Sequence, residues 1–187
     1  MSRDWEPLFT NWAKPPSVSE RERMGNAERA VRDAVSSSSA LQKHNIRVFP
    51  QGSYRNRTNV RQDSDVDICV LCTDTSYFKL PDGSTREQFG LNTPASYSDA
   101  AFRADVHAAL ANYFGATKIR AGSKAFDVHA NTYRVDADVT ACFEYRYYYE
   151  NGTYRSGTAV LPASGSYISN YPKQHYDNGY AKHQNTG

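Results

Sequence analysis

Three acidic residues and one glycine-serine pair have types and spacing that can support chemistry. Gly52-Ser53 is followed by Asp65 and Asp67, and a further acid, Asp138, lies in the β-prone run 135–139. On a strand, side chains two residues apart point the same way, about 6.5 to 7 Å apart, so Asp65 and Asp67 can share a cation. Neighbouring carboxylates repel each other, and such hard oxygen ligands favour Mg²⁺ or Mn²⁺. The spacing therefore predicts a divalent metal site.

A third ligand would come from the run 135–139. Asp138 is the natural choice, since an acid among β-prone residues is costly to bury unless it binds something. Asp136 competes for the role, because it is two residues away on the same expected strand. Two ions held by three carboxylates can lower the pKa of an attacking hydroxyl and offset charge on a leaving pyrophosphate. Gly52 permits a tight turn, and Ser53 can donate to phosphate oxygens. This combination predicts nucleotidyl transfer.

The ordered pattern resembles the DNA polymerase β superfamily of nucleotidyltransferases, which has a Gly-Ser turn, a DxD pair on a strand and a distant single carboxylate. Residues 49–58 (FPQGSYRNRT) and 64–68 (SDVDI) resemble more narrowly the bacterial cyclic GMP-AMP synthase-like CD-NTases. Residues 133–139 and 170–175 do so as well, and the likeness covers about residues 20–187. It implies an α+β fold, a polymerase β-like core in which a mixed or antiparallel sheet packs against helices.

The resemblance also implies roles for individual residues. It implies that the triphosphate is held by Gly52 and Ser53, and that further nucleotide-binding positions are Gln51, Arg55 and Thr58. Two Mg²⁺ or Mn²⁺ ions would be held by the catalytic acids Asp65, Asp67 and Asp138. Asp138 would also help to activate the attacking ribose hydroxyl. It is preferred to Asp136 because Val139 follows it, as the family pattern has.

By the same resemblance, the enzyme would join nucleoside triphosphates such as ATP or GTP into a cyclic di- or trinucleotide messenger. That messenger would act in anti-phage signalling on a cyclic-nucleotide-responsive effector. Such enzymes continue into a helical carboxy-terminal domain, so we expect residues 1–187 to be the catalytic core without that domain. We favour truncation over a minimal form that completes its cleft by association, and we expect activity to depend on the second wall of the cleft.

Two other kinds of function stay open at this point. A nucleotidyltransferase could instead modify a protein side chain or an RNA end by the same chemistry. The chain could also be a nucleotide-binding module that has lost turnover, or a structural domain whose acids bind calcium. The intact three-acid pattern argues against the last two.

Composition limits the kinds of binding partner and the cell compartment that we expect. The 187 residues fit one domain, and the 22 basic and 20 acidic residues give a net charge of +2, so no long nucleic acid is required. No apolar run approaches the roughly 20 residues that span a membrane. Three cysteines make an odd set without a disulfide framework, which favours the cytoplasm. Alternation should point Cys69 and Cys72 to opposite faces of a strand, which argues against a zinc or redox CxxC.

The elements that must position these residues can be read from periodicity. Ser17 and Glu20 predict a capping box that starts a helix ending in the Ser36–Ser39 run. Its apolar stripe comprises Met24, Ala27, Val31, Ala34 and Val35. A second helix should run from Ser98 to Gly115, with one face made by Phe102, Val106, Ala109, Leu110 and Tyr113.

The remaining segments are read mainly as strands and loops. Strands are expected at 46–49, 66–72, 118–120, 125–128, 133–149 and 158–161, with 54–61 as a possible edge strand. Residues 62–64 (Gln-Asp-Ser) supply turn chemistry before the run 66–72, so the chain on either side of them is read as a hairpin. Residues 73–97 read as a long connection, and the segment after 161 reads as polar and turn-like. The tyrosines between 145 and 149 are interpreted as sheet packing rather than as a base-stacking platform.

Overall fold

The chain folds around one mixed sheet that carries helices on both of its faces. The computed structural model describes residues 5–6, 17–56, 65–162 and 165–186. Within them the strand order is β1-β2-β5-β4-β3, and β6 pairs with β5 while β7 pairs with β6. The strands are β1 (Ile46–Pro50), β2 (Val66–Lys79), β3 (Ile119–Ala121), β4 (Phe126–Val128), β5 (Ala137–Tyr148), β6 (Tyr154–Val160) and β7 (Ile168–Asn170). The α-helices are α2 (Val18–Ser36), α3 (Gly52–Asn56), α4 (Asp99–Phe114) and α5 (Pro172–Thr186).

Helix α2 begins and ends where its sequence predicts. The Ser17 hydroxyl accepts a hydrogen bond from the Glu20 amide (3.2 Å), and the Glu20 carboxylate accepts one from the Ser17 amide (2.6 Å). This reciprocal capping satisfies two of the donors that a helix start leaves without partners. All five residues of the predicted stripe are buried. The stripe therefore fixes which face of α2 packs on the sheet.

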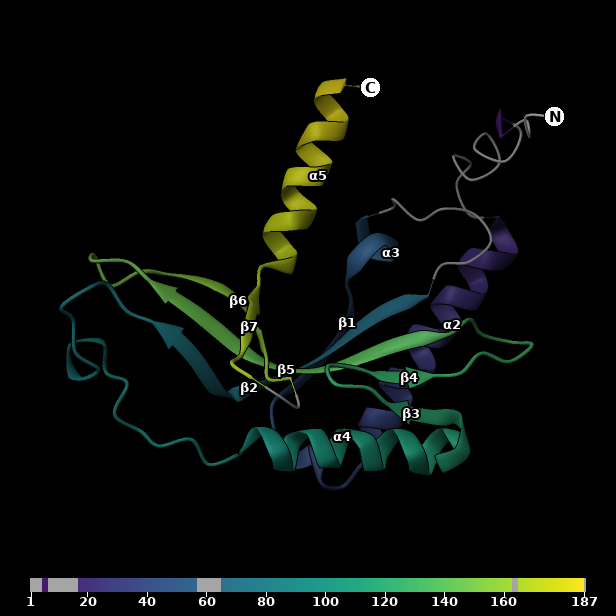
Figure 1. Ribbon diagram of the computed structural model, residues 1–187, viewed down its shortest axis with the longest axis horizontal. Helices are drawn as coiled ribbons and strands as arrows, with labels where there is room; N and C mark the ends of the chain where they lie inside the picture. Colours follow the sequence, from purple (N-terminus) through teal and green to yellow (C-terminus); the bar gives the residue numbers. More distant parts are fainter. Residues whose placement is uncertain (1–4, 7–16, 57–64, 163–164, 187) are drawn as a thin grey trace.

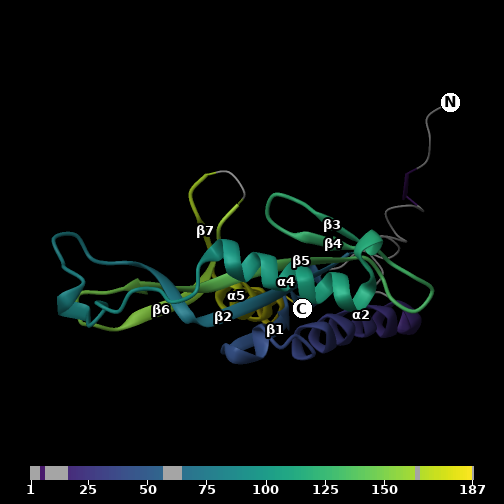
Figure 2. The ribbon, with the colours of Figure 1, turned by 90° about the horizontal axis from the view of Figure 1, so that it is seen from below.

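Helix α4 lies beside α2 on the same face of the sheet (Figures 1 and 2). Its amino terminus is capped by the Ser98 hydroxyl, which accepts a hydrogen bond from the Ala101 amide (3.2 Å). The predicted face is buried except at Tyr113, which is 47% exposed. The prediction was wrong there because Tyr113 lies in the last turn, where its ring packs on the ring of Phe114 at the edge of the core.

Different side chains pack on the two faces of the sheet. Apolar residues at even positions of β2, including Val66, Ile68 and Val70, pack in the main core with the helices α2 and α4. The intervening residues Cys69 and Leu71 join Cys142 in a smaller cluster on the opposite face. Because Asp67 has the parity of Cys69, it also lies on the face away from α2 and α4.

The three cysteines behave as buried apolar side chains. All are free thiols, and Cys69 and Cys72 point to opposite faces as predicted. The sequence did not predict that Cys69 Sγ would lie 3.0 Å from Cys142 Sγ, across β2 and β5. Burial, together with Cys142, raises the pKa of the Cys69 thiol well above its usual range. This thiol is therefore protonated and unsuited to metal binding.

The edge strand predicted at 54–61 was wrong over residues 54–56. Residues Gly52–Asn56 form the short helix α3, and residues 57–61 lie outside the described part of the chain. The hairpin is formed by β1 and β2, which pair antiparallel with Pro50 opposite Ile68. The turn needs the reversal that Gly52 provides with its φ of 64°, so the chain leaves the sheet instead of extending it.

Several strand boundaries also differ from the prediction; β6, for example, starts at Tyr154 rather than at Thr158. Strand β2 continues to Lys79, so the long connection starts only at Leu80, because β2 stays paired with β5 after a bulge between Cys72 and Ser76. Strand β5 starts at Ala137 rather than at Tyr133. Residues Tyr133 and Arg134 instead form a turn in which both amides donate to the Asn131 side chain (2.9 Å each).

The turn-like ending predicted after residue 161 was wrong as well. After β7 the chain forms helix α5, which rises from the face of the sheet opposite α4 (Figure 1). Pro172 is its first residue, a position that suits proline because its missing amide hydrogen has no helical partner there. The helix contacts α3 and β6. In the described residues, no helix is long and apolar enough to cross a membrane.

Candidate active site

The turn between β1 and β2 brings Gly52 against Asp67. The Gln51 amide donates to the Asp67 carbonyl oxygen (2.8 Å), which ties the turn to the start of β2. A Cβ atom on Gly52 would overlap the Asp67 carboxylate and lie 2.9 Å from its Cγ. Only glycine can occupy this position, because its backbone must approach the carboxylate closely with a positive φ. The glycine turn and the DxD pair of the sequence therefore meet in space.

The acids of the predicted site lie on neighbouring strands. In the parallel pairing of β2 with β5, Asp67 is directly opposite Asp138. Asp65 is the residue immediately before β2, so it lies at the strand end rather than within the strand. Figure 1 shows β2 and β5 side by side beneath α3 and α5. The structure thus brings the two ends of the sequence pattern, separated by some seventy residues, to one edge of the sheet.

The carboxylates are close enough to perturb one another. Burial, and then the charge of Asp65, raises the pKa of Asp67. Burial raises the pKa of Asp138, and the charges of Asp127, Asp65 and Asp67 raise it further. The pKa of each acid is raised because negative charge is unfavourable at this edge of the sheet unless a cation balances it.

Asp127 is a fourth acid at this edge, and the sequence reading missed it. It lies on β4 directly opposite Asp138, so Asp67, Asp138 and Asp127 form a row across three strands. Arg120, opposite Asp127 on β3, donates from Nε to its Oδ2 (2.6 Å). The available signal was an acid between two buried apolar residues, Phe126 and Val128, in a short strand. That signal lacked the strand order, which alone places β4 next to β5.

Asp136 makes different contacts from its competitor. It precedes β5, its side chain is 52% exposed, and its Oδ1 accepts a hydrogen bond from the Ala130 amide (2.7 Å). Its carbonyl oxygen accepts one from the Val66 amide (3.1 Å). The residue thus fastens the loop before β5. Because the Asp136 side chain is engaged in this loop hydrogen bond, Asp138 is favoured over Asp136 as the third acid of the site.

A pocket of about 220 Å³ opens beside Asp67. We call it the Gly52 pocket; its lining residues are Gln51, Gly52, Arg55, Asp67, Asn170, Pro172 and His175. Three of the five predicted nucleotide-binding residues line it. Ser53 follows Gly52 in α3 but is not a lining residue, and Thr58 lies outside the described residues.

The far wall of the Gly52 pocket comes from β7 and α5. Asn170, Pro172 and His175 were not predicted as site residues, although the Asn-Tyr-Pro turn that places them is visible in the sequence. Arg55 lines the pocket from α3, and its guanidinium lies 5.3 Å from the centre of the Tyr176 ring on α5. A cation beside the carboxylates is suited to phosphate oxygens.

The acids at this edge of the sheet suit metal ions that keep part of their coordination shell for other ligands. Across residues 5–6, 17–56, 65–162 and 165–186, no group of three or more His, Cys, Asp or Glu side chains forms a complete metal cage. Mg²⁺ does not need one, because it is usually held by one or two carboxylates together with water and substrate phosphates. The raised pKa values of Asp67 and Asp138 indicate an edge that favours a cation. The residues therefore fit ions that arrive with a triphosphate.

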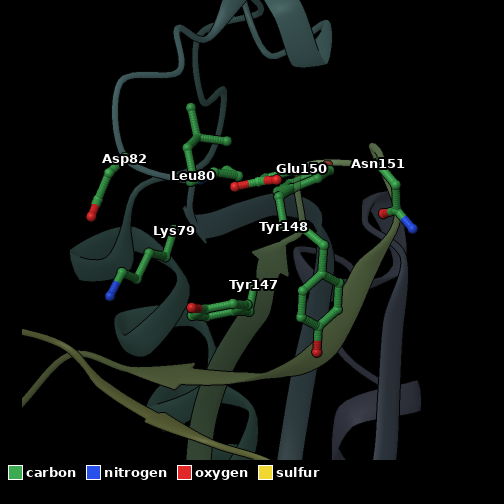
Figure 3. Close-up of a pocket in the computed structure, with 9 residues that line it drawn as sticks. Lys79, Leu80, Asp82, Tyr147, Tyr148, Glu150 and Asn151 are labelled. Atoms are coloured by element: carbon green, nitrogen blue, oxygen red, sulfur yellow. The ribbon is translucent and has the colours of Figure 1, made fainter.

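A larger hollow of about 590 Å³ lies at the other end of β2 and β5 (Figure 3). Lys79 and Asp82 line it from one side, and Tyr147, Tyr148 and Glu150 line it from the other. Tyr145 and Tyr148 are buried in the sheet, which confirms the packing role predicted for them. Tyr149 is 43% exposed. This hollow shares no lining residue with the Gly52 pocket.

Comparison with known proteins decides the family. No family model matches the chain. The chain is 48% identical to the cyclic dipyrimidine nucleotide synthase CdnE of Legionella pneumophila and 46% identical to that of Cecembia lonarensis. Each alignment covers 100% of this chain, but only 64% and 63% of those relatives. The structure also resembles the Rhodothermus marinus CdnE c-UMP-AMP synthase with Apcpp and Upnpp, with a TM-score of 0.82 and 33% identity over 97% of this chain and 61% of that one.

The chain belongs to the bacterial CD-NTase family. The CD-NTase resemblance read from the sequence is thereby confirmed, as is the α+β class with a mixed sheet packed against helices. A second CD-NTase structure, the Elizabethkingia meningoseptica CdnE with GTP and Apcpp, matches 99% of this chain and 61% of that one with a TM-score of 0.73 and 29% identity. This chain spans less than two thirds of the length of these CD-NTase relatives.

Proposed function

We propose that this chain forms the catalytic core of a metal-dependent nucleotidyltransferase that joins two nucleoside triphosphates into a cyclic dinucleotide and releases pyrophosphate. The observation that carries the proposal is the pairing of Asp67 with Asp138 beside the Gly52 turn. This arrangement places carboxylates and a phosphate-approachable backbone at one sheet edge. Membership of a family whose relatives are named cyclic nucleotide synthases supports it.

The acids would hold two Mg²⁺ or Mn²⁺ ions, with Asp67 and Asp138 at the centre and Asp65 at the strand end. Bound there, the ions would supply charge neutralisation for the attacking hydroxyl and the leaving pyrophosphate. Gly52 allows the backbone of the turn to approach phosphate oxygens, and Arg55 offers them a positive charge across the Gly52 pocket. Asp138 is the group placed to orient the attacking ribose hydroxyl.

We propose that pyrimidine nucleotides are among the substrates. The relatives at 48% and 46% identity are both named cyclic dipyrimidine nucleotide synthases, and the match to each covers the whole of this chain. UTP and CTP are therefore the first triphosphates to test, ahead of ATP and GTP. Acting in the cytoplasm, where triphosphates are available, the product would reach a cyclic-nucleotide-responsive effector in anti-phage defence.

The test is a product assay on the full-length protein with each nucleoside triphosphate, alone and in pairs. We expect a phosphatase-resistant product that forms only with Mg²⁺ or Mn²⁺ and is lost in the double variant Asp65→Ala, Asp67→Ala. Asp82→Asn, which changes an exposed acid in the loop after β2, is the matched control. Label on added tRNA or protein, rather than in a resistant small product, would replace this proposal with end or side-chain modification.

A further inference from the structure

The turn between β7 and α5 has two sides, and only one of them faces the Gly52 pocket. Asn170, Pro172 and His175 line the pocket from this turn. The ring of Tyr171, between two of them in sequence, instead lies against β6. The position of the pocket wall therefore depends on how Tyr171 is held outside the pocket.

Gly157 on β6 provides the surface on which this turn rests. A Cβ atom at this position would lie 2.5 Å from the Asn170 carbonyl oxygen and 2.9 Å from Cδ1 of Tyr171. Its φ is not in the left-handed region, so the backbone conformation does not call for glycine. Glycine is needed instead because the turn approaches β6 closely, and any side chain at 157 would push Asn170 and Tyr171 away from β6.

Arg155 contacts Tyr171 from the same face of β6. It is two residues from Gly157, and its guanidinium lies 4.0 Å from the centre of the Tyr171 ring. Its Nη1 also donates to Gln174 Oε1 in the first turn of α5 (3.4 Å). A planar cation stacked on an aromatic face is attracted to the ring, so this contact holds the Tyr171 ring against β6.

The sheet anchors Arg155 in turn. Tyr147 lies opposite Arg155 in the pairing of β5 with β6, and the guanidinium is 5.5 Å from the centre of its ring. The ring of Tyr145, two residues earlier on β5, packs edge-on against the Tyr171 ring, with the ring centres 6.1 Å apart and the ring planes at 72°. The turn is thus held on a patch built by two strands.

We propose that Arg155, Gly157 and Tyr171 form a clamp that sets the position of Asn170 and His175 in the Gly52 pocket. The three are positioning residues, since the turn transmits their effect to the pocket wall. The inference rests on the proposed function in one respect, that the Gly52 pocket receives a nucleotide. It adds that affinity for the triphosphate is set partly from β6, outside the pocket.

The kinetic test compares Gly157→Ala, Arg155→Ala and Tyr171→Ala with the control Gly25→Ala in the full-length protein. Gly25 lies in α2, and no atom of the described residues lies within 4 Å of a Cβ atom there, so its change adds a methyl group without a clash with them. We expect KM for the triphosphate to rise roughly tenfold in the clamp variants, with kcat changed less than KM, because displaced positioning groups weaken substrate binding. Tyr171→Phe keeps the ring and should stay within about twofold of wild type.

A double variant separates the clamp from general destabilisation. Arg155 contacts the turn chiefly through the Tyr171 ring and has only one long hydrogen bond to Gln174 besides, so the variant Arg155→Ala, Tyr171→Ala should have a KM closer to that of Tyr171→Ala alone than to the product of both effects. Independent, multiplying effects would overturn the clamp. So would KM values of all three single variants that match Gly25→Ala.

Hydrogen exchange tests the clamp without any turnover. The His175 amide donates to the Tyr171 carbonyl oxygen (3.1 Å), so its exchange reports on the first turn of α5. Arg155→Ala should accelerate this exchange at least several-fold and leave the exchange of α2 unchanged. If wild type forms no product from any triphosphate, the proposed function fails while this measurement still decides the clamp. Unchanged exchange at His175 would refute it.

Discussion

Asp67 and Asp138 occupy directly opposed positions on the neighbouring parallel strands β2 and β5, on the face of the sheet that also carries α3 and α5. Parallel strands place residues of the same register at the same edge, so these two acids stay together as long as the β2–β5 pairing holds. Each has a raised pKa, to which burial contributes most. The pair is thus a site of unfavourable negative charge at the starting ends of two neighbouring inner strands.

Substitution of the two candidate third acids should have unequal effects. Asp138→Asn should lower product formation by roughly 100-fold or more, because charge stabilisation by a bound ion is worth several kcal/mol. Asp136→Asn should retain activity within a few-fold, since its Oδ1 accepts a loop hydrogen bond that an amide oxygen can also accept. Turnover of the full-length variants and calorimetric titration with Mn²⁺ measure both effects. The reverse ranking would make Asp136 the third ligand.

Stability of the metal-free protein should respond to pH through Asp138. Its raised pKa means that the folded state holds a proton that the unfolded state has lost, so this carboxyl destabilises the fold as pH rises from the ordinary Asp pKa through the raised one. Asp138→Asn should therefore raise Tm at neutral pH, and the gain should vanish below the ordinary Asp pKa, where both states are protonated. Thermal melts in EDTA from pH 3 to pH 8 check this.

Added Mn²⁺ provides the control for that measurement. It should raise the Tm of the wild type and leave the Tm of Asp138→Asn nearly unchanged, because ligands that bind only the folded state stabilise it by mass action. A Tm gain from Asp138→Asn that persists at pH 3 would show that the effect is steric rather than electrostatic.

Gly52 should be irreplaceable because its backbone lies against the Asp67 carboxylate, and Gly83, which also has a positive φ, provides the control. Gly52→Ala and Gly83→Ala both place a side chain at positive φ, at 64° and 77°, which costs about 1 kcal/mol or more in each case. Only at Gly52 would the new Cβ overlap the Asp67 carboxylate, whereas at Gly83 it would have no atom within 4 Å among the residues that the structure describes. We expect both variants to lose stability by urea unfolding, and Gly52→Ala to lose more, because the Asp67 carboxylate must move to admit the new Cβ.

Triphosphate binding should then separate the two glycine variants. Gly52→Ala should lose detectable binding, and Gly83→Ala should bind as the wild type does. Isothermal titration with a non-hydrolysable triphosphate measures this difference. Equal affinities in the two variants would contradict a role for the close approach of Gly52 to Asp67.

Asp127 should raise the pKa of the neighbouring acid, Asp138. Its charge is the largest contribution after burial to the raised pKa of Asp138, so Asp127→Asn should lower that pKa. Arg120→Gln removes the cation bonded to Asp127 and should raise the pKa of Asp138 further. Carbon-detected NMR of the Asp carboxyl groups in the metal-free protein follows both changes. Asp82→Asn, an exposed and distant change, should leave the Asp138 titration where it is.

The sequence by itself determined the local features of this protein. The Ser17–Glu20 capping box and the stripe of α2 follow from side-chain chemistry and a 3.6-residue period, and the structure confirms both. The ordered Gly-Ser, DxD and single-acid pattern was sufficient to indicate the family, because its members share those residues in that order. These signals are readable because each lies within a few residues of chain or in a fixed order along it.

Only the tertiary structure decided how distant segments meet. Asp127 joined the acids because β4 pairs with β5, and Asn170 and His175 reached the Gly52 pocket because β7 pairs with β6 and α5 contacts α3. Helix α5 itself carries a polar sequence without a clear apolar stripe, so its contacts with α3 and β6 supply what periodicity could not show. Strand order and helix docking are set by burial and pairing between residues far apart in the chain. No local pattern encodes those energies.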